Sequence, residues 1–377
     1  MRRSVCSCGL ALFLGWVLLA MFPVPALADG GAPNLAYVAG AGSGISIIDI
    51  GQKKVTGTFA LAGHPQSVYL SLDGRFLYIA QPALNQISVL AAKTGQLVCQ
   101  AHVAGAPSFQ SYDPQTNSLF VAGTQATSIS DLNLSTCAIL STWQTRAPVQ
   151  GMVVVNLASD TTDNQLWVSN GSGVSVFDVK TGKQLTTVSL PGTPRYLSAP
   201  PGAWVYVSTQ QGSLYAMSLT SDRVLPLLSG GQFGTMDFDE TTGEVYVPDR
   251  LHHQLDVITP PDSLATKAPA EPIHTYALSG TPVSVAITSD GQLGFVALTT
   301  GQVVMLDILG HQVLQTIHVG GDPQYIITGL YPPVLGSTPQ QASILDSLAT
   351  IIAYLLVAAC MVVPIWYIVR KNHKNKE

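Results

Sequence analysis

Short runs of alternating apolar and polar residues fill the chain from about residue 34 to residue 331. A representative stretch begins after Pro65, where such runs cover 67–70, 76–80, 86–90 and 97–103. Asp73-Gly74 and Thr94-Gly95 separate the first pair and the last pair of runs, and Asp-Gly and Thr-Gly supply the positive backbone angles of hairpin turns. Alternation with a period of two, bounded by such turns, predicts four antiparallel strands.

The four-strand unit recurs along the chain, and each copy opens on a small-residue turn that ends in proline. Six such anchors are Gly63-His64-Pro65, Gly105-Ala106-Pro107, Arg146-Ala147-Pro148, Gly192-Thr193-Pro194, Gly280-Thr281-Pro282 and Gly321-Asp322-Pro323. A degenerate copy without proline lies at Gly234-Thr235, and the spacing between successive anchors is 41 to 47 residues. Units of this length and order are typical of propeller blades. We therefore predict an all-β fold over residues 29–331, a seven-bladed β-propeller with four antiparallel strands per blade.

The two ends of the repeat predict how the ring closes. The first copy, from Leu35, has no opening strand, whereas the residues after Gly321-Asp322-Pro323 form an opening strand alone. We expect this last strand to complete the first blade, because closure removes the free sheet edges of an open array.

Some strand pairs carry a family resemblance. The run Leu35–Ala39 followed by Ile45–Asp49, and the run Leu166–Asn170 followed by Val174–Asp178, resemble the YVTN family of β-propeller repeats, in the lactonase-like propeller superfamily. Six of the seven copies match, over roughly residues 34 to 331. The resemblance implies a surface or periplasmic propeller and no particular activity. The blade from Thr235 departs from the pattern, and its insertion at 260–272, rich in Pro and Ala, predicts a protruding loop.

Two apolar segments flank the repeats. Residues 1–28 have a basic start, an apolar run and an Ala26-x-Ala28 site, which predict a cleaved signal peptide. Residues 347–369 contain no charge and would span roughly 35 Å as a helix, enough to cross a hydrocarbon core. A Pro-rich spacer at 332–346 precedes this segment and a basic tail at 370–377 follows it. The tail predicts a single-pass type I plasma-membrane protein with the N-terminus outside, the C-terminus inside and the propeller extracytoplasmic.

Charge argues against a nucleic-acid partner. The chain is 47% hydrophobic and only 10% charged. Between Asp29 and Ser343 there are 11 Lys and Arg against 20 Asp and Glu, a net charge of 11 − 20 = −9. Binding of DNA or RNA requires clustered cations, and the exported part contains no such cluster.

Only two of the five cysteines lie in the predicted exported part, namely Cys99 and Cys137. An exported location permits a disulfide between them. The repeat aligns both with the last strand of consecutive copies but in different registers, so we expect two separate buried thiols, with a disulfide as the alternative. The sequence contains no C-x-x-C-H motif for covalent haem and predicts no cofactor.

Candidate binding residues follow from the anchors, because the first strand of each blade should line the central channel. We expect a channel mouth filled only by water; the alternative is that the polar positions beside the anchor prolines form a ligand-binding ring there. The ring consists of His64, Gln66, Arg195, Asp237, Asp322 and Gln324.

The positions of the acidic residues and histidines in the sequence argue against a metal site. A hard cation in the channel needs oxygen ligands from several blades, whereas Asp237 and Asp239 are the only acidic residues on any predicted first strand. His252 and His253 lie beside Asp249, yet neighbouring strand residues point to opposite faces. We therefore predict no metal site and no catalytic set.

Two functions remain open. The first is a binding scaffold at the cell surface with a protein or glycan partner outside the cell. The second is a propeller hydrolase or lyase of lactonase type, acting on a small molecule at the channel mouth.

Overall fold

The computed structural model describes residues 34–113, 116–155, 164–171, 173–267 and 271–329. The predicted signal peptide, the spacer, the membrane segment and the tail lie outside these residues. No helix within the described part is long and apolar enough to cross a membrane.

The described strands form seven four-stranded antiparallel sheets, each one blade, as predicted. We letter the blades A to G in chain order. Blade A holds β28 (Tyr325–Thr328), β1 (Leu35–Ala41), β2 (Gly44–Asp49) and β3 (Lys54–Ala60). Blade B holds β4 (Ser67–Leu70), β5 (Phe76–Gln81), β6 (Gln86–Ala91) and β7 (Leu97–His102), with the 3₁₀ turn η1 (Pro82–Leu84) between β5 and β6. Blade C holds β8 (Pro107–Asp113), β9 (Ser118–Gly123), β10 (Ser128–Asn133) and β11 (Ile139–Gln144). Blade D holds β12 (Val149–Val155), β13 (Gln165–Asn170), β14 (Gly173–Asp178) and β15 (Gln184–Ser189).

The remaining three blades follow the same order. Blade E holds β16 (Pro194–Ser198), β17 (Trp204–Thr209), β18 (Ser213–Ser218) and β19 (Val224–Ser229). Blade F holds β20 (Asp237–Phe238), β21 (Val245–Asp249), β22 (Gln254–Ile258) and β23 (His274–Ala277). Blade G holds β24 (Pro282–Ile287), β25 (Leu293–Leu298), β26 (Gln302–Asp307) and β27 (Gln312–His318).

The ring closes through the first blade. Strand β28 pairs with β1 in an antiparallel register from Ala36 opposite Thr328 to Ala39 opposite Tyr325. Asp322 and Gln324 also donate their backbone N–H groups to Gly40 and Ala39. The predicted closure by the last strand is confirmed.

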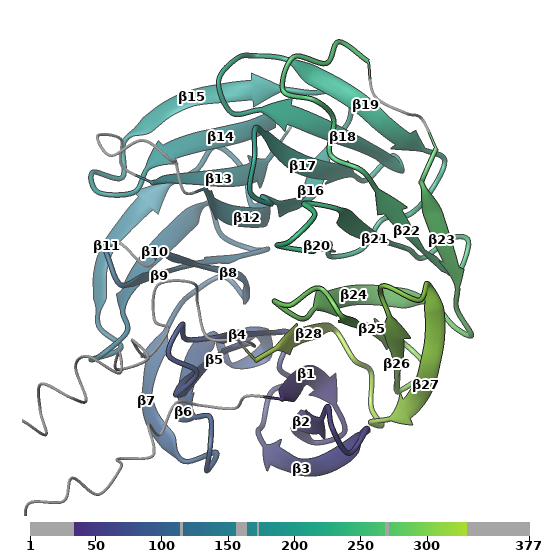
Figure 1. The fold of residues 1–377 in the computed structure, drawn as a ribbon. Coiled ribbons are helices and arrows are strands. Elements are labelled where there is room, and N and C mark those ends of the chain that lie inside the picture. The colour runs from purple at the N-terminus through teal and green to yellow at the C-terminus, as the bar shows by residue number, and fades with distance from the viewer. Residues whose placement is uncertain (1–33, 114–115, 156–163, 172, 268–270, 330–377) are drawn as a thin grey trace, which may run out of the picture. The chain divides into compact units, whose positions relative to one another are not determined.

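Figure 1 shows the first strand of every blade innermost, around one centre. A parallel bridge between Thr235 and Ser284 joins the innermost segments of blades F and G. We call the end at which the inner strands begin the mouth face; it also carries the turns between second and third strands. The opposite end, with the turns between third and fourth strands, is the exit face, because the chain leaves β28 there after Thr328.

The core lies between neighbouring blades. Tyr37 and Ile45 of blade A pack with Leu77 and Ile79 of blade B in one buried cluster, and other clusters join blades B with C, C with D, D with E, E with F, F with G and G with A. Strands buried on both sides need apolar residues at successive positions, which second strands such as β5 and β17 have. Outer strands such as β3 bury alternate residues only.

Blade F departs from the repeat, and its insertion contacts blade E. Trp204 of blade E donates from Nε1 to the carbonyl of Pro261 at 3.0 Å. Arg223 of blade E donates to the carbonyl of Ala265 at 3.0 Å, and Ala265 packs into the apolar cluster of blades E and F. Blade E therefore supplies donors and apolar surface to part of the insertion, while Leu264 within the insertion is 80% exposed.

Cys99 and Cys137 form a disulfide with a Cα–Cα distance of 6.0 Å, joining blades B and C. The expectation of two separate thiols is wrong, because Cys137 does not lie on the last strand of its blade. It occupies the turn before β11 with a φ of 58°, where the left-handed backbone changes the register that the repeat predicts.

Candidate functional site

A cavity of about 280 Å³ lies along the channel, lined by inner strands from all seven blades. Four of the six predicted ring residues line it, namely Gln66, Arg195, Asp237 and Gln324. His64 and Asp322 do not; both are exposed in the anchor turns, on the outer side of the proline. The residue after five of the six anchor prolines therefore lines the cavity, with Val149 as the exception, whereas His64 and Asp322 before the proline do not.

Asp237 lies deeper than the ring. It pairs with Tyr246, and the equivalent pair in blade B is Tyr69 with Tyr78, three residues beyond Gln66. The missing proline explains the misplacement, because without the anchor the repeat does not mark where the inner strand of blade F begins. Asp237 thus lies within the channel rather than at its rim.

The Asp237 carboxylate extends the contact between blades F and G. Thr235 exchanges backbone hydrogen bonds with Val283 and Val285 of β24. One step further along, the backbone N–H of Ile287 donates to Oδ2 of Asp237 at 2.7 Å. The side chain therefore takes the place of a backbone acceptor between the two inner strands.

Burial, with a small contribution from the negative charge of Glu240, raises the pKa of Asp237 to about 7. The backbone N–H groups of Ile287 and Phe238 oppose this shift because they stabilise the charged form. The group therefore exchanges a proton near neutral pH.

Five aromatic side chains surround the cavity, each half-buried and each from a different inner strand: Tyr69, Phe109, Tyr196, Phe238 and Tyr325. Burial raises the pKa of Tyr69 to about 12, with a contribution from the negative charge of Asp237. Burial and the same carboxylate also raise the pKa of Tyr325. Both hydroxyls therefore remain protonated and face the field of Asp237.

Arg195 is held in place at the mouth. Its guanidinium lies 4.9 Å from the centre of the Tyr196 ring and donates to the Tyr196 hydroxyl at 3.1 Å. Its backbone carbonyl accepts from Oγ of Ser169 at 2.5 Å. Gly151 passes so close to this carbonyl that an added Cβ would lie 2.1 Å from the oxygen, so the neighbouring strand requires glycine there.

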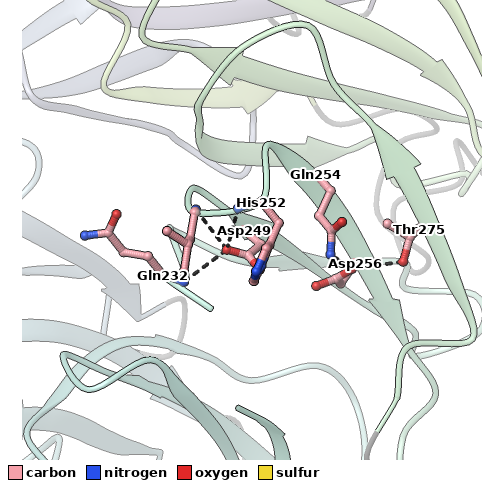
Figure 2. A network of polar contacts seen from close by, with 7 residues as sticks. Gln232, Asp249, His252, Gln254, Asp256 and Thr275 are labelled. Atoms are coloured by element: carbon pink, nitrogen blue, oxygen red, sulfur yellow. Dashed lines mark hydrogen bonds and ion pairs between the residues drawn. The ribbon is translucent and has the colours of Figure 1, made fainter. Parts of the chain in front are cut away.

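Arg250 also lines the cavity, from the turn after β21. Figure 2 shows how the buried Asp249 organises this turn. The Asp249 carboxylate accepts from the backbone N–H of Gln232 at 3.0 Å and of Leu251 at 3.0 Å, and contacts Nδ1 of His252 at 2.6 Å. These hydrogen bonds hold the pKa of Asp249 below its usual range despite its burial, and raise that of His252. Asp249 is therefore a positioning residue for Arg250.

Two polar atoms at the cavity are buried with no hydrogen-bond partner among the described residues. One is Nε of Arg250, a donor, and the other is Oε1 of Gln110, an acceptor. Nε2 of Gln110 donates to Oγ of Ser67 at 2.8 Å and to the backbone carbonyl of Ser67 at 3.4 Å, and the carbonyl fixes the direction of the amide because it can only accept. Unpaired buried polar atoms are costly, and a ligand is one way to satisfy them.

His252 and His253 lie in a turn rather than on a strand, and they have different partners. His252 pairs with Asp249, whereas Nε2 of His253 lies 3.5 Å from Oγ1 of Thr281. Among the described residues no group of three or more His, Cys, Asp or Glu could hold a metal ion.

The six ring residues predicted from the sequence leave out most of the residues that line the cavity. Tyr69, Phe109, Gln110 and Tyr196 follow the ring positions along the same inner strands, so extending the count by a few residues could have found them. Arg250 has no such signal, because it comes from a second-to-third strand turn.

No model of a known protein family matches the sequence, and no curated protein matches it. Solved structures do match in fold. A putative 6-phosphogluconolactonase from Bacteroides uniformis is 16% identical with a TM-score of 0.63, covering 78% of this chain and 98% of that one. The dihydro-heme d1 dehydrogenase NirN, in complex with DHE, is 14% identical with a TM-score of 0.58, covering 82% and 78%. The Cps50 (Swd1) β-propeller domain of Myceliophteria thermophila is 14% identical with a TM-score of 0.61, covering 73% and 92%. At these identities the similarity concerns the fold alone, which in this chain is a seven-bladed β-propeller.

Proposed function

We propose that this chain is a membrane-anchored, extracytoplasmic binding protein of the cell surface, whose channel mouth captures an acidic glycan by a carboxylate-bearing sugar. The observation that carries the proposal is the pair of guanidinium groups of Arg195 and Arg250 at one cavity, neither of which has an ion-pair partner among the described residues.

The lining suits such a ligand. Guanidinium groups bind carboxylates with paired hydrogen bonds, and these are stronger than neutral hydrogen bonds. The unpaired Oε1 of Gln110 can accept from a sugar hydroxyl, and aromatic faces such as Tyr196 can pack on the apolar face of a sugar ring. A volume of about 280 Å³ lies near the lower end of the range of about 300–1,000 Å³ for ligand pockets, which fits one sugar unit rather than a polymer.

The proposed cellular location and membrane anchoring rest on the sequence. The predicted signal peptide at 1–28 and the apolar, basic-flanked segment at 347–369 support an exported, anchored chain. The resemblance of the repeats to the YVTN family, typical of surface and periplasmic propellers, supports the same location.

Calorimetric titration of the detergent-solubilised full chain with uronic-acid oligosaccharides and their neutral counterparts tests the proposal. We expect Arg195→Gln and Arg250→Gln each to weaken binding of the acidic ligand about 10- to 100-fold, since a hydrogen bond to a charged group is worth about 1.5–3 kcal/mol. Arg146→Gln is the matched control, because Arg146 is exposed and does not line the cavity. Equal binding of acidic and neutral sugars, or equal loss in all three variants, would contradict the proposal. Preference for an acidic peptide would assign a protein partner instead.

Asp237 favours a second candidate, a hydrolase or lyase of the lactonase type. A carboxyl group with a pKa of about 7 inside a channel can accept and donate a proton at neutral pH. Screening of lactones and uronic-acid glycosides should then detect turnover that Asp237→Asn abolishes while binding persists. Turnover that is unchanged in Asp237→Asn would remove this assignment.

A further inference from the structure

The exposed large apolar side chains of the described residues are unevenly distributed between the two faces of the propeller. Thirteen such residues are at least partly open to solvent, and only Leu84 and Leu251 belong to mouth-face turns. The other eleven lie at the exit face: Leu72, Leu97, Val98, Ile139, Leu140, Leu185, Leu264, Ile273, Leu309, Val313 and Leu314. They come from five blades, B, C, D, F and G.

The apolar residues gather where the outer strands begin. β7, β11 and β27 each have two neighbouring apolar residues within their first three positions, of which Leu140 is 58% exposed. Successive strand residues point to opposite sides, so both sides of these outer strands are apolar at this end only. A concentration of exposed apolar residues on one face is typical of an interaction site, whereas apolar residues scattered singly are ordinary surface. We call these eleven residues the exit rim.

The course of the chain indicates what covers the exit rim. β28 ends at Thr328, so the last described residue, Gly329, leaves the propeller at the exit face. The predicted membrane segment begins at Ser347, only 347 − 329 = 18 residues further on. At about 3.3–3.6 Å per residue the connection reaches roughly 60 Å at most.

We propose that the exit rim docks on the outer surface of the lipid bilayer, an inference that rests on the anchoring in the proposed function. Apolar side chains at the rim enter the interfacial region, where burial of their apolar area favours binding. The channel mouth then faces away from the membrane, toward ligands that arrive from outside.

The charge of the exit face indicates the kind of contact. Its described turns carry several carboxylates, among them Asp49, Asp73, Asp178 and Asp307, which accept hydrogen bonds from their own turns. The described cations of the same face are fewer than its carboxylates; they are Lys53, Lys54, Arg75, Lys93, Lys180, Lys183, Arg223 and Lys267. The contact is therefore apolar, and neither anionic lipid nor low salt should be needed for it.

Site-specific fluorescence of the full chain in neutral phosphatidylcholine nanodiscs tests the docking. In a Cys360→Ser background, Leu140→Cys at the exit rim and Leu251→Cys at the mouth face give matched probe sites, since both leucines are 58% exposed. Each is labelled with an environment-sensitive dye without reductant, which preserves the disulfide between Cys99 and Cys137. Leu185→Cys provides a second rim site if Leu140→Cys fails to fold.

We expect lipid-borne nitroxide to quench the probes at 140 and 185 several-fold more than the probe at 251, equally in low salt and in 1 M salt. Equal quenching at rim and mouth, or stronger quenching at 251, overturns the docking and leaves the anchoring intact. A full chain that alkaline carbonate extracts from its membranes overturns the anchoring in the proposed function, and the docking with it.

Discussion

Replacing Asp237 with asparagine changes the one acidic side chain among the described residues that line the cavity. The asparagine carbonyl can still accept the N–H of Ile287, which Asp237 binds at 2.7 Å. The substitution therefore removes the titrating carboxyl group while retaining the contact between blades F and G.

The sign of the effect follows from the raised pKa. An unfolded aspartate titrates near 3.9, whereas burial raises the pKa of Asp237 in the native state to about 7. Between these values the unfolded chain releases a proton that the native chain keeps, so the native protein loses stability as the pH rises from about 4 to 7. Three pKa units correspond to about 4 kcal/mol at most. Because Asp237 is half-buried at an open cavity, we expect about 1–2 kcal/mol after allowance for solvent.

Urea unfolding of the full chain in detergent at pH 4.5, 6.0 and 8.5 measures this difference. Asp237→Asn should gain about 1–2 kcal/mol relative to the unmodified protein between pH 4.5 and pH 8.5. Asp322→Asn is the control, because Asp322 is exposed and lies outside the cavity. A stability difference for Asp237→Asn that stays constant over this pH range would refute the placement of the carboxyl group in a desolvating channel.

Three further substitutions test the disulfide, the closing strand and the insertion of blade F. Replacing Cys99 and Cys137 together by serine should lower the free energy of unfolding by about 4 kcal/mol, from the 38-residue separation that the disulfide closes, and a loss below 1 kcal/mol in urea unfolding would contradict this. Ile326 lies on the closing strand and is 2% exposed. Ile326→Ala should lower the free energy of unfolding by about 2–4 kcal/mol and speed amide hydrogen exchange in β1, its pairing partner. Unchanged exchange in β1 would argue against closure through β28. Trp204→Phe removes the hydrogen bond to Pro261, which should lower the free energy of unfolding by about 1 kcal/mol and speed proteolytic cleavage within the insertion of blade F. Identical cleavage rates would show that this bond does not hold the insertion.

The repeat made the blade count and the closure predictable, because period and anchor recur independently of any single residue. Prediction failed where the anchor was missing or where a turn intervened. Asp237 was assigned to the rim because Thr235 has no proline beside it, although the strand pairing of Asp237 with Tyr246 places it deeper. Cys137 was assigned to a strand although it adopts a left-handed turn conformation, and strand alternation contains no information about such a residue.

Blade F contains most of what the repeat does not explain, and this is where function is expected. Elsewhere, acidic residues such as Asp73 and Asp178 accept hydrogen bonds from their own turns at the exit face, so the fold itself accounts for them. Blade F adds a carboxyl group inside the channel at Asp237 and an unpaired donor on Arg250, and it uses Asp249 to position that donor. The inner strand of blade F is two residues long and pairs with β21 only at Asp237 and Phe238, whereas Thr235 before it pairs with blade G. Because local sequence rules are most often broken at functional sites, the departure of blade F from the repeat supports binding at the blade E and F side of the mouth.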